Sequence, residues 1–440
     1  MRRGRCRFQS LSHCQFRTYS ALHLFRTKMG ELDDLTTSAR SVIRETVNKL
    51  NQELWQVNLD LHGHPETAFQ EFFAHDTICR FLEGLKFDVR RSAYGLATSF
   101  EVESGTDGRL VVFCAEYDAL PQIGHGCGHN LIATSSIAAF LATAEALKRS
   151  GRPGRVRLLG TPAEEAGGGK ARLLDSGAFP DDTAAAIMAH PMCAQQILYD
   201  TSHGYQGLAA LKFIATHLFK TEFHGKTAHA AAEPWNGVNA FDAAVAAYSN
   251  VALLRQHIQP DDRVHAVMDV GGTVPNVIPD YTRGSWMVRS PTIERANRLL
   301  QRVKSCIQAG ASAAGCDITY QESPTYLNLT SNKTLCEVYV EEMAANDQKI
   351  MLQQEKPMNA STDMGNVAHR VPSFHGAFIV PAGADITLHS SDFAKAAGTE
   401  AAHIVAMNCA KGMAMLAARV LLDPEIAESA KCDFRDNHGW

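Results

Sequence analysis

The sequence predicts an α/β fold with a mixed, mainly parallel sheet that is interrupted by a smaller α+β domain. In "LVVFCAEYD", "VRLLGTPAEE" and "AAAIMAHP", an apolar run of strand length ends in a loop with acidic or histidine side chains. Such runs are typical of buried strands in a parallel sheet. Between residues 204 and 322 the patterns follow the order strand, helix, strand, strand, helix, strand, which is the order of a ferredoxin-like module.

The remaining segments divide the chain into parts. Residues 32–85 carry apolar side chains at helical spacing, "LIATSSIAAFLATAEALKRSG" predicts a helix that Gly151 ends, and a last helix is expected through Leu421. We interpret the alternating segment "LAALKFIATHLFK" as one half-exposed strand that opens the insertion. The expected parts are an N-terminal segment at residues 1–30, a larger domain at 31–203 and 323–440, and an inserted domain at 204–322.

The composition favours a soluble enzyme. Of the 440 residues, 45% are hydrophobic and 20% are charged, and the net charge is -5, so no broad basic face predicts a nucleic-acid partner. No stretch approaches roughly eighteen uninterrupted apolar residues, so we predict no transmembrane helix and no membrane partner. Eleven cysteines are too dilute for a disulfide scaffold. We expect most of them to be small buried side chains in a reducing compartment.

The first thirty residues differ from the rest in charge. They carry arginines at positions 2, 3, 5, 7, 17 and 26 and no acidic residue before Glu31. An arginine-rich, serine-containing and acid-free segment is typical of a mitochondrial presequence. The alternative is that Met29 is the true start of the protein. The expected location is therefore mitochondrial or cytoplasmic, depending on which alternative holds.

The motif "GHGCGHN", residues 124–130, gathers donor side chains among glycines. In extended backbone Cys127 and His129 point to the same side, and the glycines allow close approach. Thiolate and imidazole bind zinc and similar divalent ions. His125 has the same parity, so spacing alone leaves it open as a third donor. The alternative is a nucleophilic Cys127 with either histidine as its base.

Glu164, Glu165 and His190 follow predicted strands, and we expect them at the same edge of the sheet as this motif. Adjacent buried carboxylates repel each other and lose hydration unless a cation neutralises them. A metal ion would neutralise them, with one glutamate as ligand and the other as base for a bound water. The simpler alternatives are a solvated loop for the glutamates and a packing role for His190.

Eight motifs follow one another along residues 32–421. They are "AEYDALPQIGHGCGHN", "GTPAEEAGGGK", "MAHP", "HGKTAHAA", "GGTVPNVIPD", "VRSPT", "ASTDMGNVAH" and "LHSSDF". In this order they resemble the M20 family of metallopeptidases and amidohydrolases, in its branch with an H-x-C-G-H loop. The resemblance implies a metallopeptidase catalytic domain with an inserted ferredoxin-like lid domain, in agreement with the fold predicted above.

The resemblance also implies roles for single residues. The implied metal ligands are Cys127, His129, Glu165, His190 and His389. Glu164 is the implied general base, Asp118 orients the metal site from behind the ligands, and His125 shapes the loop without binding metal. His389 would not be chosen from the residues alone, since it looks like a residue before a helix cap at Ser391. The implied cofactor is one or two divalent ions per subunit, zinc, manganese or cobalt, because mixed donors accept several metals.

In the expected lid, His229 resembles the group that stabilises the tetrahedral oxyanion, and in dimeric relatives it comes from the neighbouring subunit. Asn276 and Arg289 resemble groups that hold the substrate's carbonyl or its terminal carboxylate. Arginine suits bidentate carboxylate binding, and a histidine donor can stabilise an oxyanion once water is excluded. The implied partner is a second copy of the chain, joined through the lid as a homodimer.

The implied activity is that of a dipeptidase or N-acyl-amino-acid amidohydrolase. In that activity Glu164 would take a proton from a water on the metal, the hydroxide would attack the substrate carbonyl, and Glu164 would then protonate the leaving amine. The branch implies dipeptides with a basic C-terminal residue, or acylated glutamates, as small-molecule substrates. Two alternatives stay open: a non-catalytic binding or regulatory subunit, and an acyl transferase that uses Cys127.

Three positions depart from the pattern of many relatives. Asn130 stands where an aspartate is common, and Gly126 where an alanine is common. Glu116 begins a Glu-x-Asp in place of Asp-x-Asp. Asn130 marks the branch. A contact of Glu116 with a second metal ion stays open, and Glu116 is not counted among the ligands.

Overall fold

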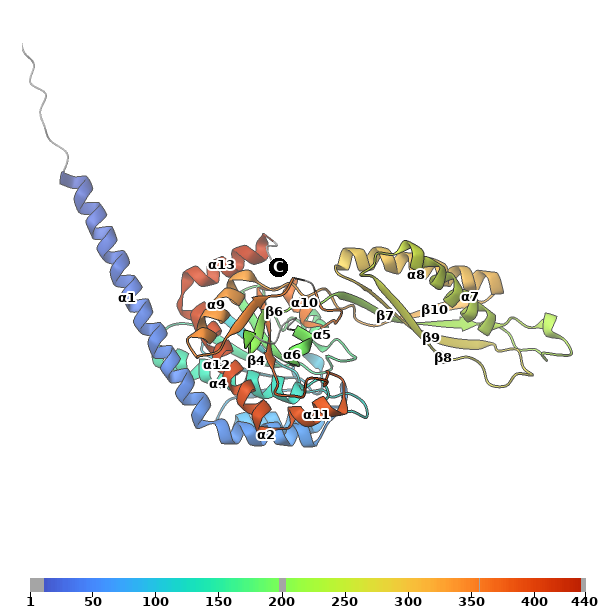
Figure 1. Cartoon of the computed structure of the whole chain (residues 1–440), viewed down its shortest axis with the longest axis horizontal. Coiled ribbons are helices and arrows are strands. Elements are labelled where there is room, and N and C mark those ends of the chain that lie inside the picture. The colour runs from blue at the N-terminus through green and yellow to red at the C-terminus, as the bar shows by residue number, and fades with distance from the viewer. Residues whose placement is uncertain (1–11, 198–202, 356, 437–440) are drawn as a thin grey trace, which may run out of the picture.

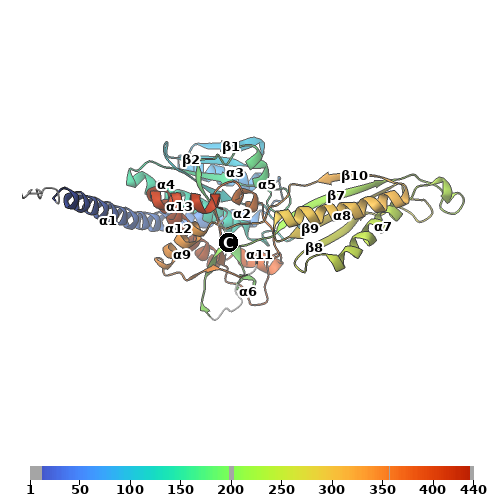
Figure 2. The same ribbon diagram turned by 90° about the horizontal axis from the view of Figure 1, so that it is seen from above.

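The computed structural model describes residues 12–197, 203–355 and 357–436. They form a larger domain and a smaller domain that projects from one side of it (Figure 1). The helix α1 (Ser12–Lys49) extends on the opposite side of the larger domain, as Figure 2 shows from above. The predicted presequence, residues 1–30, lies in part outside the described residues.

The larger domain contains an eight-stranded sheet in the order β1-β2-β4-β3-β5-β12-β6-β11. The central pairs β4–β3, β3–β5 and β5–β12 are parallel, whereas β1–β2, β2–β4 and β12–β6 are antiparallel. The strands are β1 (Val89–Arg91), β2 (Phe100–Ser104), β3 (Leu110–Ala115), β4 (Arg155–Gly160), β5 (Thr183–Met192), β6 (Gly207–Ala210), β11 (Ile350–Gln353) and β12 (Ser373–Ile379). The predicted mixed, mainly parallel sheet is confirmed.

Helices pack on this sheet around two apolar cores. The helices of the first core are α1, α2 (Asn51–Gly63), α3 (Phe72–Gly84), α4 (His129–Ser150), α9 (Lys333–Ala344), α11 (Ser391–Ala397), α12 (Glu400–Leu422) and α13 (Pro424–Arg435). Those of the second are α5 (Gly169–Asp175), α6 (Ala194–Ile197) and α10 (Met364–Ala368). Parallel strands between two such layers align their carboxyl ends at one edge, where binding sites form.

Two helices, α4 and α12, are long and apolar enough to cross a membrane by length and composition alone. In this fold they pack against each other and against the sheet. In the most apolar 18-residue stretch of each helix, 94% of α4 and 72% of α12 is buried inside the protein. Burial in the first apolar core therefore accounts for much of their apolar character.

The smaller domain is a four-stranded antiparallel sheet in the order β10-β7-β9-β8, with α7 and α8 packed on one face. Along the chain its elements are β7 (Ala215–His224), α7 (Ala240–Leu253), β8 (Arg263–Val270), β9 (Tyr281–Ser290), α8 (Ile293–Ala314) and β10 (Asp317–Glu322). The order strand, helix, strand, strand, helix, strand matches the ferredoxin-like module predicted from the sequence. We call residues 215–322 the lid.

The lid begins later than residue 204, where the sequence placed its boundary. β6 is fully buried and pairs with β12 and β11 of the larger sheet. "LAALKFIATHLFK" therefore contains two strands and not the single half-exposed strand expected. Its first part is apolar on both faces because it lies inside the larger sheet, and only the second part, β7, alternates.

Candidate active site

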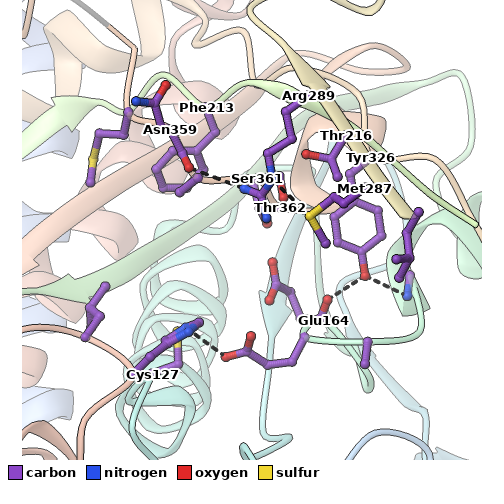
Figure 3. Close-up of a pocket in the computed structure, with 18 of the residues that line it drawn as sticks. Cys127, Glu164, Phe213, Thr216, Met287, Arg289, Tyr326, Asn359, Ser361 and Thr362 are labelled. Atoms are coloured by element: carbon purple, nitrogen blue, oxygen red, sulfur yellow. Dashed lines mark hydrogen bonds and ion pairs between the residues drawn. The ribbon is translucent and has the colours of Figure 1, made fainter. Parts of the chain in front are cut away.

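A cavity of about 490 Å³ lies between the larger domain and the base of the lid. Cys127, Glu164, Glu165, His190 and His389 line it from the larger domain. Met287 and Arg289 line it from the lid. In β9 alternate side chains are buried under the lid helices, so these two side chains lie on the open face of the lid sheet. Figure 3 shows Glu164 and Cys127 across the cavity from Arg289 and Met287.

Residues 124–130 lie where the loop after β3 leads into α4, which starts at His129. Gly124 and Gly128 have φ angles of 73° and 77°, a left-handed conformation that glycine adopts without strain. The buried His125 hydrogen-bonds the carbonyl of Leu61 through Nε2 at 3.0 Å. His125 thereby fastens the loop to α2, and neither group of potential ligands that contains Cys127 includes it.

One group of potential ligands consists of Cys127, His129 and His190, whose donor atoms all lie within 4.8 Å of one another. The Sγ of Cys127 is 3.4 Å from Nε2 of His190. The other nitrogen of His190, Nδ1, is 2.7 Å from the carbonyl oxygen of Pro191. If Nδ1–H donates to that carbonyl, the Nε2 lone pair is left for a metal, which is the usual arrangement of a ligating histidine.

A second group consists of Cys127, Glu165 and His389. Nε2 of His389 is 3.5 Å from Oε1 of Glu165. The backbone N–H of His389 donates to the carbonyl of Gly126 at 2.8 Å, which holds this distant segment against the 124–130 loop. The helix that follows, α11, is capped by Ser390 and not by Ser391 as expected, since Ser390 accepts from the N–H of Phe393.

Asp118 lies behind both groups and contacts a member of each. Its Oδ1 is 3.0 Å from Nδ1 of His129, and its Oδ2 accepts the backbone N–H of Glu165 at 3.0 Å. Burial alone would raise the pKa of Asp118, but the charge of His129 and the hydrogen bond to it hold that pKa below its usual value. Asp118 is thus placed to orient one potential ligand from each group.

Replacing Asp118 by asparagine is expected to weaken metal binding about 10- to 100-fold, because partners of ligating side chains contribute on that scale. An amide can replace one acceptor oxygen but not both. Equilibrium dialysis of the metal-stripped protein measures the effect. Asp392→Asn is the matched control, since Asp392 is an exposed acid on α11 that pairs with Lys395. Equal affinity in Asp118→Asn and wild type would contradict the orienting role.

Glu164 is buried beside Glu165 at the turn after β4. Burial, and then the neighbouring charges of Glu116 and Glu165, raise its pKa well above its usual value. Two residues that the sequence did not reveal hold this turn. Tyr326 donates its hydroxyl to the carbonyl of Glu164 at 2.6 Å, and Glu71 accepts the N–H of Ala163 at 2.9 Å.

Three buried polar atoms converge on this site without a hydrogen-bond partner. They are Oε2 of Glu116, Nε2 of His129 and Oε1 of Glu165. Buried polar atoms are nearly always paired, so such a cluster indicates an ion or a ligand. Burial and the charge of Glu165 raise the pKa of Cys127 well above its usual value, and a divalent cation offsets both effects. The donor set therefore fits a divalent metal ion.

Two predicted site residues lie away from this cavity. His229 and Asn276 are exposed in the loops 225–239 and 271–280, and neither lines the cavity. Nδ1 of His229 accepts the N–H groups of Ala231 and Ala232 at 3.2 and 3.1 Å. The cavity contacts the start of β7 at Thr216. Since β7 has ten residues, the loop after it lies about 30 Å away along the strand.

The buried donor set, the adjacent glutamates and the cavity define a metal-dependent hydrolase. Residues 112–409 match the family described as Peptidase family M20/M25/M40. The chain belongs to this family, as its ordered motifs suggested.

Relatives place it among enzymes that hydrolyse amide or peptide bonds. The chain is 36% identical over 411 residues to the Xaa-Arg dipeptidase of Mus musculus, and the alignment covers 89% of this chain and 91% of that protein. It is 27% identical over 325 residues to one component of the p-aminobenzoyl-glutamate hydrolase of Escherichia coli, covering 70% of this chain and 64% of that one.

A solved structure supports the fold. The dinuclear metal-binding M20 peptidase of Bacillus subtilis superposes with a TM-score of 0.58 at 21% identity, over 84% of this chain and 99% of that one.

Proposed function

We propose that this enzyme hydrolyses the amide bond between an acyl or aminoacyl group and an amino acid with a free carboxylate. The observation that carries the proposal is the arrangement of Glu164 and Arg289 on opposite sides of one cavity. A volume of about 490 Å³ is within the range of small-molecule sites. The dipeptide and acyl-glutamate substrates named for the relatives belong to this class.

In this mechanism, a bound divalent ion supplies Lewis acidity toward the carbonyl and toward water. Glu164 takes a proton from the attacking water and delivers it to the nitrogen of the leaving amine. Tyr326 and Glu71 keep the Glu164 backbone in place, so that the carboxylate needs no reorganisation during the reaction. Arg289 binds the free carboxylate of the substrate, and His229 donates to the developing oxyanion.

Five donors are proposed to hold the metal: Cys127, His129, Glu165, His190 and His389. Their grouping into two sets that share Cys127 favours two ions per subunit. Thiolate and imidazole donors suit zinc and cobalt, while the carboxylates also accept manganese. The proposed ions are therefore zinc, manganese or cobalt.

Replacing Arg289 by methionine is expected to raise KM about 10- to 100-fold for a dipeptide, since hydrogen bonds to charged groups contribute about 1.5–3 kcal/mol. The same substrate with its carboxylate blocked as an amide should show no such change. Steady-state kinetics on both compounds measure this. Arg283→Met is the matched control, because Arg283 lies on the same face of β9 but pairs with Asp269. Equal losses on both compounds would contradict carboxylate binding by Arg289.

We further propose that the chain works as a homodimer through the lid. α7 exposes Phe241, Val245 and Tyr248 along one side, and the adjacent edge strand β8 exposes Val267 and Met268. Val267 is 68% exposed. An apolar edge strand with unpaired backbone groups favours pairing with another strand. The β8 strand of a second copy can pair with these backbone groups by symmetry. The second copy also supplies His229 and Asn276, which are distant from the cavity of their own chain.

A further inference from the structure

Ala163, the residue before Glu164, has a backbone conformation that is unusual for alanine. Its φ angle is 60°, a left-handed conformation that costs an L-residue free energy. This conformation turns the chain sharply after β4 and so sets the direction in which Glu164 leaves the sheet. Glycines, which would adopt it without strain, follow only at positions 167–169. Strained residues of this kind concentrate at functional sites, where one particular geometry is required.

Glu71 holds this conformation from a distant segment, the loop between α2 and α3. Its Oε1 accepts the N–H of Ala163 and the N–H of Phe69, both at 2.9 Å. Phe69 has a φ angle of 61°, so one oxygen atom holds two left-handed residues from two different segments. The other oxygen, Oε2, accepts the hydroxyl of Thr98 at 2.8 Å. Glu71 thus connects the turn that carries Glu164 to two parts of the larger domain.

Phe69 packs against the same turn. A Cβ added at Gly167 would lie 2.4 Å from the ring of Phe69 and 2.8 Å from the Cβ of Ala163. Gly167 donates its N–H to the carbonyl of Ala163 at 3.0 Å and lines the cavity. The two left-handed residues that Glu71 holds therefore both contact the turn at the cavity wall, and a change in either one would move that turn.

The carboxylate of Glu71 is costly to bury. It is fully buried, and its three hydrogen-bond donors are all neutral groups. A buried charge that is held only by neutral groups loses much of its hydration free energy. Burial accordingly raises the pKa of Glu71 to about 7. A costly group beside a strained residue, both next to Glu164, indicates a task in placing Glu164.

Glu165, the neighbouring residue and a proposed metal ligand, is held separately. Asp118 accepts the backbone N–H of Glu165 at 3.0 Å, and Tyr326 donates to the carbonyl of Glu164 at 2.6 Å. Glu71 therefore acts on the chain before Glu164, while Asp118 acts after it. Loss of the Glu71 side chain should displace Glu164 and leave the backbone bond to Glu165 in place.

We propose that Glu71 is a positioning residue for the reaction: by holding Ala163 in its left-handed conformation, it keeps the carboxylate of Glu164 directed into the cavity. This proposal rests on the proposed role of Glu164 as the base. The role of Glu71 depends on where its oxygens lie and not on its charge, because an amide of the same shape can accept the same two backbone N–H groups.

Glu71→Ala is expected to lower kcat about 10- to 100-fold, the scale on which a displacement of about 1 Å affects catalysis. KM should stay within about twofold, because Arg289 is untouched. Glu71→Gln should recover most of the lost kcat. Adding Ala163→Gly to Glu71→Ala should recover at least about fivefold, because glycine adopts the left-handed conformation without strain. Steady-state kinetics measure all of these variants.

Thr98→Val is the matched control. It removes one hydrogen bond of Glu71 but neither of its bonds to the backbone, so kcat should stay close to the wild-type value. Equal losses of kcat in Glu71→Ala and Glu71→Gln overturn the proposal, and so does an equal loss in Thr98→Val or a change in KM alone. Circular dichroism checks folding. If Glu71→Ala does not fold, Glu71→Asp, whose carboxylate is one methylene shorter, replaces it with the same expected results.

Amide hydrogen exchange followed by mass spectrometry tests Glu71 without turnover. Exchange in residues 163–168 should be at least about tenfold faster in Glu71→Ala, since a buried hydrogen bond has been lost, and close to wild type in Glu71→Gln. Unchanged exchange in Glu71→Ala overturns the proposal. A wild type that hydrolyses no dipeptide or N-acyl amino acid would instead contradict only the proposed function, because the exchange experiment still decides whether Glu71 holds the turn.

Discussion

Replacing Glu164 by glutamine is expected to remove turnover while the protein keeps its metal. We expect kcat to fall about 10²- to 10⁴-fold, the range that a positioned base contributes, because an amide cannot take the proton from water. Glu164 belongs to neither ligand group that contains Cys127, but only to a third group with Glu116 and His129, so the ions proposed at Cys127 should stay bound. A direct assay of amine release gives the rate, and elemental analysis gives the metal per chain.

Glu165→Gln is the matched control for this experiment, since it changes the adjacent carboxylate that faces His389. It should lose both metal and activity. A chelator should inactivate the wild type, and added metal should restore it, whereas an acyl transferase that uses Cys127 would be insensitive to chelation. A Glu164→Gln enzyme with near-wild-type kcat would falsify the assignment of Glu164 as the base.

Two variants with low activity on their own, Glu164→Gln and His229→Ala, are expected to restore activity when they assemble into mixed dimers. His229→Ala alone should lose about 10²- to 10³-fold in kcat, the effect of removing one oxyanion donor. In a mixed dimer, one site combines Glu164 of the His229→Ala chain with His229 of the Glu164→Gln chain. Random assortment of co-expressed chains should give about a quarter of the wild-type rate, because half of the dimers are mixed and each holds one intact site.

The control for this pair combines Glu164→Gln with Arg289→Met. Both residues line the cavity of the same chain, so a mixed dimer contains no intact site. At a substrate concentration below KM, the rate should therefore not exceed the rate that the Arg289→Met chains give on their own. Size-exclusion chromatography with light scattering checks that all variants form dimers. Restoration by the control pair as well, or by neither pair, would contradict the supply of His229 from the second copy.

The grouping of the central site residues was predictable from sequence because parallel strands end at one edge of a sheet. The runs that form β3, β4 and β5 each lead into acidic or ligating side chains, and their short length favours buried strands over helices. Glu164, Glu165 and His190 could therefore be expected near the 124–130 loop. The same reasoning predicted the lid, because its strands and helices alternate in the order of a known module.

Other parts of the site depend on contacts between distant segments. His389 contacts the 124–130 loop through a backbone hydrogen bond to Gly126, and no local sequence pattern indicates such a contact. Lys170 and Glu71 look like ordinary charged residues in sequence. Only the structure shows that both are buried, that Glu71 bonds the backbone beside Glu164, and that Lys170 bonds Glu116 and Asp363. The start of the lid was misplaced because a short buried strand, β6, precedes an alternating one without a turn signal.

The donors and Arg289 belong to different bodies of the molecule. The proposed metal ligands all come from the larger domain, while Arg289 comes from the lid, which joins that domain through the segments beside β7 and β10. With Arg289 as the proposed carboxylate group, a rotation of the lid would move it and leave the proposed metal ligands in place. Retention of metal and release of product would then be independent of each other.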